Sequence, residues 1–100
     1  MYYILGHAQC PNCVLAKELL DKRKAQYVYV DLKALMGEDW RQIFKMTELW
    51  EGRTKPSSIP LIFNSKHFVP IFDQVDLLKL VRARYIGGLS DLQDILSLNL

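Results

Sequence analysis

Cysteine and histidine are scarce in this chain of 100 residues, which holds two of each. So few cysteines cannot build the disulfide framework of a small secreted protein. No apolar run approaches the roughly 20 residues that a membrane-spanning helix needs. The opening segment, MYYILGHAQC, lacks the basic n-region and the long apolar h-region of a secretory signal peptide. These absences predict a cytoplasmic protein that does not span a membrane.

An excess of charge of one sign is also missing. The 13 basic and 11 acidic residues leave a formal net charge of +2, whereas a dedicated nucleic-acid binder carries a clustered basic excess. Half of the residues are hydrophobic, which suffices for one buried core in a chain of this length. We therefore expect a single domain over residues 1–100 and no nucleic-acid partner.

The two cysteines, Cys10 and Cys13, stand three positions apart. A disulfide between them closes almost no loop, so a purely stabilising role is disfavoured. Cys-x-x-Cys is also half of a structural zinc site, but His7 and His67 do not form the clustered second ligand pair that is usual in zinc fingers. Redox chemistry is therefore the favoured interpretation, and we expect no resident metal.

The residues around the cysteines predict a strand, a turn and a helix. Residues 2–5 are aromatic and aliphatic, as in a short buried strand, and a glycine marks their end. Apolar residues then recur at helical spacing over 13–20. Pro11 suits the first helical position, because the missing N–H would be unpaired there anyway. Cys10 is thereby placed at the helix start, where free N–H groups and the helix dipole favour a thiolate, with Cys13 one turn further on.

The rest of the chain predicts alternating strands and helices. Residues 27–32 complete a right-handed βαβ unit with parallel strands. Asp73 is a candidate cap for the helix that follows it, although the same segment also suits an extended hairpin. Ser90 and Gln93 match a capping box at the start of a last helix. The other expected elements are a helix over 37–51 with a core face of Trp40, Ile43, Phe44, Thr47 and Trp50, strands at 59–63 and 67–69, and helices over 73–85 and through 92–96.

Three segments carry a family resemblance. Cys10-Pro11-Asn12-Cys13 is followed by Ser58-Ile59-Pro60 before a strand, and by Ile86-Gly87-Gly88 before a helix whose free N–H groups form a natural anion site. In this order, with Tyr29-Val30-Asp31 ending the second strand, they resemble a glutaredoxin of the dithiol class. The resemblance implies an α/β, thioredoxin-like fold with a central mixed four-stranded sheet flanked by helices. The chain departs from that pattern by an insertion around residues 69–85.

The resemblance also implies an activity. Glutaredoxins are glutathione-dependent oxidoreductases that reduce protein disulfides and glutathione mixed disulfides, with glutathione as the reducing co-substrate. Cys10 would be the nucleophile and Cys13 the resolving thiol, with Pro11 and Asn12 between them in the active-site motif. The family's habitual partners are disulfide-containing proteins such as ribonucleotide reductase, and we expect a monomer. The implied glutathione-binding residues are Ile59, Pro60 as a cis-proline, Gly87, Gly88, Ser90 and Asp91.

Two positions of the active-site region depart from the family's pattern. Asn12 stands where tyrosine is frequent in glutaredoxins. His7 stands where a basic residue is common, and its weaker charge at neutral pH reduces its hold on the glycyl carboxylate of glutathione. Arg41, Lys45 and Lys55 are the alternative sources of that charge.

Two further functions remain open from the sequence. A thioredoxin-like reductase, fed by thioredoxin reductase, would use the same Cys-x-x-Cys motif, although Gly87 and Gly88 argue against it. A glutathione-assisted iron–sulfur or zinc binder would use Cys10 as a ligand. Pro11 and a resolving Cys13 disfavour cluster assembly, so the oxidoreductase is the preferred hypothesis.

Overall fold

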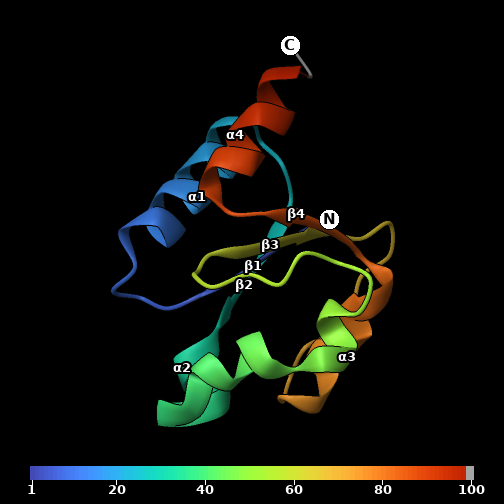
Figure 1. The fold of residues 1–100 in the computed structure, drawn as a ribbon. Coiled ribbons are helices and arrows are strands. Elements are labelled where there is room, and N and C mark those ends of the chain that lie inside the picture. Colours follow the sequence, from blue (N-terminus) through green and yellow to red (C-terminus); the bar gives the residue numbers. More distant parts are fainter. Residues whose placement is uncertain (99–100) are drawn as a thin grey trace.

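A four-stranded sheet forms the centre of the computed structural model, which describes residues 1–98 (Figure 1). The strand order is β2-β1-β3-β4. β1 and β2 are parallel, as the predicted βαβ unit requires, whereas β3 is antiparallel to both β1 and β4. The strands are β1 (Tyr2–Gly6), β2 (Tyr27–Asp31), β3 (Leu61–Asn64) and β4 (Arg84–Gly87).

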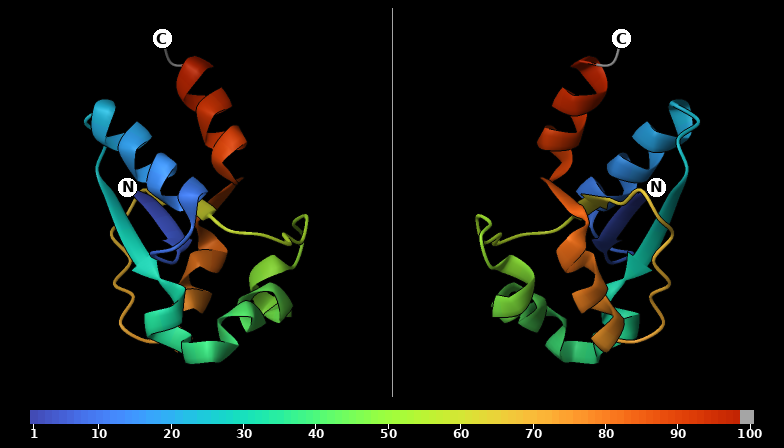
Figure 2. Two further views of the ribbon diagram at one scale, coloured as in Figure 1. Left: turned by 90° about the vertical axis from the view of Figure 1, so that its left-hand side faces the viewer. Right: turned by 90° about the vertical axis from the view of Figure 1, so that its right-hand side faces the viewer.

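Helices cover both faces of this sheet. Two long helices lie side by side on one face, and four shorter helical segments cover the other (Figures 1 and 2). The first pair is α1 (Pro11–Lys22) and α4 (Leu89–Leu98); the second group is α2 (Leu32–Met36), the 3-10 helix η1 (Gly37–Lys45), α3 (Thr47–Trp50) and the 3-10 helix η2 (Val75–Arg82). This arrangement is the thioredoxin-like fold that the resemblance implied. Within residues 1–98, no helix has the length and apolar character to cross a membrane.

β1 contributes to the hydrophobic core on both faces of the sheet. Its side chains alternate, so Tyr3 and Leu5 face the group of short helices while Ile4 faces α1 and α4. All three side chains are fully buried. The continuous apolar run at the start of the sequence therefore reflects a central strand with two covered faces.

The helix expected over residues 37–51 is divided in the structure. η1 has non-helical backbone at Asp39 and ends at Lys45, and Met46 separates it from the single turn of α3. Leu49 and Trp50 of α3 are both buried. Of the predicted core face, Trp40, Ile43 and Trp50 are buried, Phe44 is half-buried and Thr47 is exposed.

The strand expected at residues 67–69 is wrong. Val69 N–H donates to the hydroxyl of Tyr3, 2.5 Å away, and Pro70 has no N–H for a ladder. β3 pairs instead with β4, which begins at Arg84. The connection between β3 and β4 therefore runs over residues 65–83. It contains most of the segment expected as an insertion around residues 69–85, whereas Arg84 and Tyr85 belong to the sheet.

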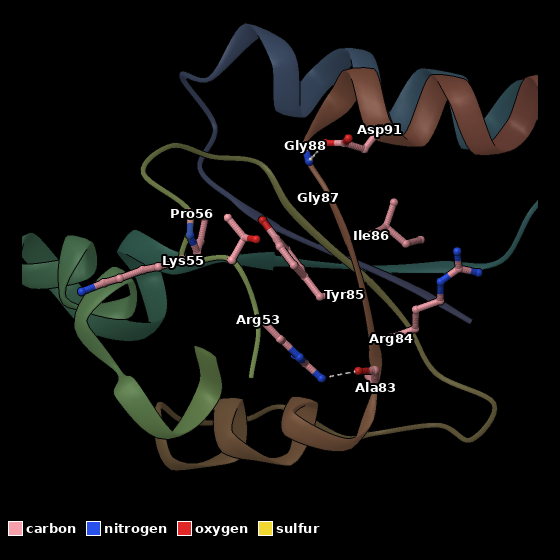
Figure 3. Close-up of a pocket in the computed structure, with 11 residues that line it drawn as sticks. Arg53, Lys55, Pro56, Ala83, Arg84, Tyr85, Ile86, Gly87, Gly88 and Asp91 are labelled. Carbon is pink, nitrogen blue, oxygen red and sulfur yellow. Dashed lines mark hydrogen bonds between the residues drawn. The ribbon is translucent and has the colours of Figure 1, made fainter. Parts of the chain in front are cut away.

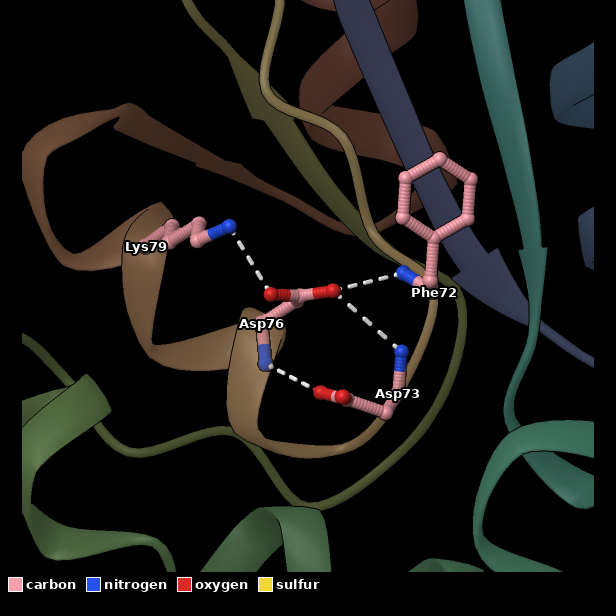
Figure 4. A network of polar contacts seen from close by, with 4 residues as sticks. All are labelled: Phe72, Asp73, Asp76 and Lys79. Carbon is pink, nitrogen blue, oxygen red and sulfur yellow. Dashed lines mark hydrogen bonds and ion pairs between the residues drawn. The ribbon is translucent and has the colours of Figure 1, made fainter.

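The helix predicted over residues 73–85 is present as the shorter 3-10 helix η2, whose N-cap residue is Gln74 rather than Asp73. Asp73, one position earlier, still accepts a hydrogen bond from the first turn (Figure 4). Asp73 Oδ1 accepts from Asp76 N–H at 3.0 Å, and Asp76 Oδ2 accepts from the N–H groups of Phe72 at 2.7 Å and Asp73 at 3.3 Å. Lys79 Nζ lies 2.8 Å from Asp76 Oδ1. The hydrogen bond from Lys79, and then those from the backbone, hold the pKa of Asp76 below its usual value.

Leu77→Ala should lower the free energy of unfolding by about 2–5 kcal/mol, because Leu77 of η2 is fully buried and its truncation leaves a cavity. Val81→Ala in the same helix is the matched control. Val81 is 42% exposed, so its truncation should cost less than about 1 kcal/mol. Urea unfolding followed by circular dichroism measures both. Small and equal effects would mean that η2 does not belong to the core.

Candidate active site

Cys10 is the N-cap residue of α1, as the sequence predicted. Its backbone is extended and Pro11 follows in the first turn of the helix. The N–H of Cys13 donates to Cys10 Sγ at 3.2 Å. A backbone donor and the positive end of the helix dipole therefore both face this sulfur, which stabilises negative charge on it.

The two thiols differ in their environment. Cys10 is 8% exposed and Cys13 is 1% exposed. Burial, and then the hydrogen bond with Cys10, raise the pKa of Cys13 to about 12. Cys13 is consequently a neutral thiol at pH 7, and a neutral thiol is not a nucleophile. Cys10 is the sulfur that is placed to attack.

Gly6, the last residue of β1, makes room for the sulfur of Cys13. A Cβ atom built at Gly6 would overlap Cys13 Sγ, so no larger residue fits without moving the thiol. The Tyr29 hydroxyl lies 3.8 Å from the Cβ atom built at Gly6. Burial, and then the proximity of Cys13, raise the pKa of Tyr29 to about 12, which keeps this phenol neutral. From the sequence, Gly6 is predicted only to end a strand; a glycine at a strand end before Cys-x-x-Cys is the signal that points to this role.

A cavity of about 390 Å³, here called the central cavity, lies beside the cysteine motif. It includes Asn12 of α1, the loop before β3 and the first turn of α4. The Ile59–Pro60 peptide bond in that loop is cis, as the resemblance implied. Of the six residues predicted to bind glutathione, the cavity is lined by Ile59, Pro60, Gly88, Ser90 and Asp91. Gly87 is buried at the end of β4 and lines a neighbouring cavity instead.

The capping box predicted for Ser90 and Gln93 is wrong. α4 begins at Leu89, so Ser90 lies inside its first turn. Asp91 caps the helix instead, because its Oδ2 accepts from the N–H of Gly88 at 2.9 Å. Gly87 has φ +124°, and a Cβ atom there would overlap the Asp91 carboxylate. The glycine is therefore required both by its backbone conformation and by the cap.

A second cavity, of about 350 Å³, contains the residues directly before Cys10. The ring of His7 meets the ring of Trp40 edge-on, with centroids 5.2 Å apart. The Arg41 guanidinium lies 4.7 Å from the centre of the Trp40 ring. Arg41 thus shares this cavity with His7, whereas Lys55 lines other cavities. Arg41 is the best placed of the three cations that the sequence suggested.

The side chains that could hold a metal ion are His, Cys, Asp and Glu. Among residues 1–98, no group of three or more His, Cys, Asp or Glu side chains is arranged to hold a metal ion. Cys10 and Cys13 are both free thiols.

Iodoacetamide at pH 7 should modify Cys10 and spare Cys13. A thiol with a pKa of about 12 has a thiolate fraction on the order of 10⁻⁵ at this pH, and the labelling of Cys13 should rise only as the pH approaches that value. Peptide mapping by mass spectrometry identifies the modified cysteine. Rapid labelling of Cys13 in the wild-type chain, before Cys10 is fully modified, would contradict its neutral state. Cys10→Ser is the comparison: it removes the hydrogen bond and the charge of Cys10, so Cys13 should react faster there than in wild type.

Gly6→Ala should lower the free energy of unfolding by about 1–3 kcal/mol, because the added methyl group overlaps Cys13 Sγ. The double variant Gly6→Ala/Cys13→Ala should recover most of this loss, since the sulfur is gone. Cys13→Ala alone completes the double-mutant cycle, measured by thermal unfolding. Additive effects of the two substitutions would mean that the contact with the sulfur is not what excludes a side chain at position 6.

Comparison with known proteins agrees with this geometry. A family model described as Glutaredoxin matches residues 1–69, which include the cysteine motif and the cis-proline. Among solved structures, the glutaredoxin (grx-1) from Archaeoglobus fulgidus is similar at 20% identity, over 81% of this chain and 85% of that chain, with a TM-score of 0.48. The curated protein sequences contain no match. The chain therefore belongs to the glutaredoxin family and is a thiol–disulfide oxidoreductase.

Proposed function

We propose that the protein is a dithiol glutaredoxin, which uses glutathione to reduce protein disulfides and glutathione mixed disulfides. The observation that carries the proposal is the unequal pair of sulfurs at the start of α1. Cys10 receives a backbone N–H and faces the helix dipole, whereas Cys13 is buried and neutral. These environments suit a nucleophile and a resolving thiol, in that order.

The reaction begins with attack by the Cys10 thiolate on one sulfur of the substrate disulfide. A bond forms between that sulfur and Cys10 Sγ, the substrate S–S bond breaks, and the leaving thiolate takes a proton from solvent. Cys13 then gives up its proton and attacks Cys10 Sγ, which releases the second substrate thiol and leaves a Cys10–Cys13 disulfide. Two molecules of glutathione reduce this disulfide to the dithiol and leave as glutathione disulfide.

The state of Cys10 regulates the second attack. Two of the influences that raise the pKa of Cys13, a hydrogen bond and a charge, come from Cys10. Both are lost when Cys10 Sγ becomes part of a mixed disulfide, because that sulfur is then neutral. Burial alone remains to oppose deprotonation. Cys13 thus becomes a better nucleophile at the stage at which it is needed.

Glutathione fits the central cavity by the chemistry of its lining. The backbone of Ile59 beside the cis-proline would pair with the cysteinyl part of glutathione. The first turn of α4 supplies free N–H groups for the γ-glutamyl carboxylate, with Asp91 available to the ammonium group. Arg41 lies with His7 in the second cavity rather than in the central one, and from there would supply positive charge for the glycyl carboxylate. Each end of the tripeptide thereby meets a group of complementary charge.

The proposed setting is the cytoplasm, where glutathione keeps thiols reduced. The protein would act there as a monomer on disulfide-containing proteins, for which ribonucleotide reductase is one test substrate. A supply of electrons from glutathione, rather than from thioredoxin reductase, is part of the proposal. The two sources are compared directly by measuring turnover with each reductase system.

Cys10→Ser should abolish turnover, with a loss on the order of 10²-fold or more, because no other described sulfur is placed to attack. Cys13→Ser should keep deglutathionylation within about threefold of wild type and lose most protein-disulfide reduction, since only the latter needs a resolving thiol. NADPH consumption coupled through glutathione reductase measures both. Full activity in Cys10→Ser would contradict the proposal. Turnover that depends on thioredoxin reductase and not on glutathione would mean that thioredoxin reductase, rather than glutathione, supplies the electrons.

A further inference from the structure

A larger cavity, of about 610 Å³, adjoins the central cavity at the outer edge of the sheet (Figure 3). It lies between residues 53–56 and β4, and β4 is the last strand in the sheet order. We call it the edge cavity. It shares Pro56, Tyr85, Gly88 and Asp91 with the central cavity. A chain bound in the central cavity can therefore continue into the edge cavity.

Three of the four charged residues that line the edge cavity are cationic. Arg53, Lys55 and Arg84 line it, together with the carboxylate of Asp91, one oxygen of which is engaged by the N–H of Gly88. In Figure 3, Lys55 and Arg84 extend to opposite sides, with Tyr85 between them. Both cations are exposed, and neither takes part in an ion pair in the described part of the chain. The rim thus carries uncompensated positive charge.

Arg53 links the loop before β3 to the end of η2 and brings a positive charge into the lining of the edge cavity. Its Nη2 donates to the carbonyl oxygens of Val81 and Ala83, at 2.6 and 2.5 Å. Its Nη1 is buried and has no hydrogen-bond partner among residues 1–98. The guanidinium also lies 5.6 Å from the centre of the Phe63 ring, and burial lowers the pKa of Arg53. Nη1 has no exposed surface, so Arg53 contributes its charge to the lining rather than a donor that a ligand could reach.

We propose that the edge cavity binds an acidic segment of the protein substrate, so that the enzyme prefers disulfides flanked by Asp or Glu residues. This inference rests on the proposed function, because the segment is the continuation of the chain whose disulfide reaches Cys10. The guanidinium charge of Arg53 in the lining attracts a carboxylate of the segment. Lys55 and Arg84 at the rim attract the segment and orient it, an effect that salt screens.

Two peptides with the same internal disulfide, flanked on both sides by either Glu or Lys residues, test the preference. Wild-type kcat/KM should be roughly tenfold higher for the Glu peptide at low ionic strength, and the ratio should approach one at about 0.5 M salt. Lys55→Glu/Arg84→Glu should reverse the ratio. Both positions are exposed, so the fold should tolerate the substitutions.

The matched control is Lys22→Glu/Lys66→Glu, which changes the net charge equally at exposed positions outside the lining of the edge cavity. It should keep the wild-type ratio. The mixed disulfide of glutathione and 2-mercaptoethanol is too small to reach the edge cavity from Cys10. Its turnover, and the KM for glutathione, should be the same in all three proteins.

The possible outcomes separate the two proposals. Equal kcat/KM for the Glu and Lys peptides, with normal turnover of the small mixed disulfide, would overturn the acidic preference and leave the glutaredoxin activity intact. A raised KM for glutathione in Lys55→Glu/Arg84→Glu would assign the edge cavity to glutathione and also overturn the preference. Absence of turnover of the small mixed disulfide in wild type would overturn the proposed function itself.

Discussion

The position of β1 is the constraint on which the rest of the structure depends. This strand is hydrogen-bonded on both edges, by β2 and β3, and its side chains are buried on both faces. It therefore cannot shift along its neighbours without exposing apolar surface. Its last residue, Gly6, touches the sulfur of Cys13. The depth of burial of the Cys13 thiol, and hence its protonation, follows from the register of the central strand.

Features that depend on neighbouring residues were accessible from the sequence. The strand, turn and helix around Cys10 and the hydrogen bond that Asp73 accepts each involve contacts within a few residues. β4 was missed because its partner in β3 lies about twenty residues away, and because Val69 uses its N–H on Tyr3. Trp50, which follows the break between η1 and α3, packs against Phe63 in β3. Such long-range choices leave no local signal.

The insertion and the candidate site are physically connected. Arg53 precedes the loop that carries the cis-proline, and its guanidinium holds the carbonyl groups of Val81 and Ala83 at the end of η2. Leu77 and Leu80 anchor the same helix in the core. The extra residues therefore support one wall of the edge cavity. Their role was not readable from the sequence, because Arg53 there has the appearance of an ordinary loop cation.

The shortness of β4 also bears on self-association. An exposed edge strand invites pairing with a second chain, and proteins limit this with short strands and charged residues. β4 has four residues, begins with the exposed Arg84 and is followed at once by the turn into α4. Two copies meeting at this edge would bring like charges together over very few backbone hydrogen bonds. The edge of β4 can thus remain accessible to a substrate segment, while its shortness and charge disfavour the growth of intermolecular sheets at high protein concentration.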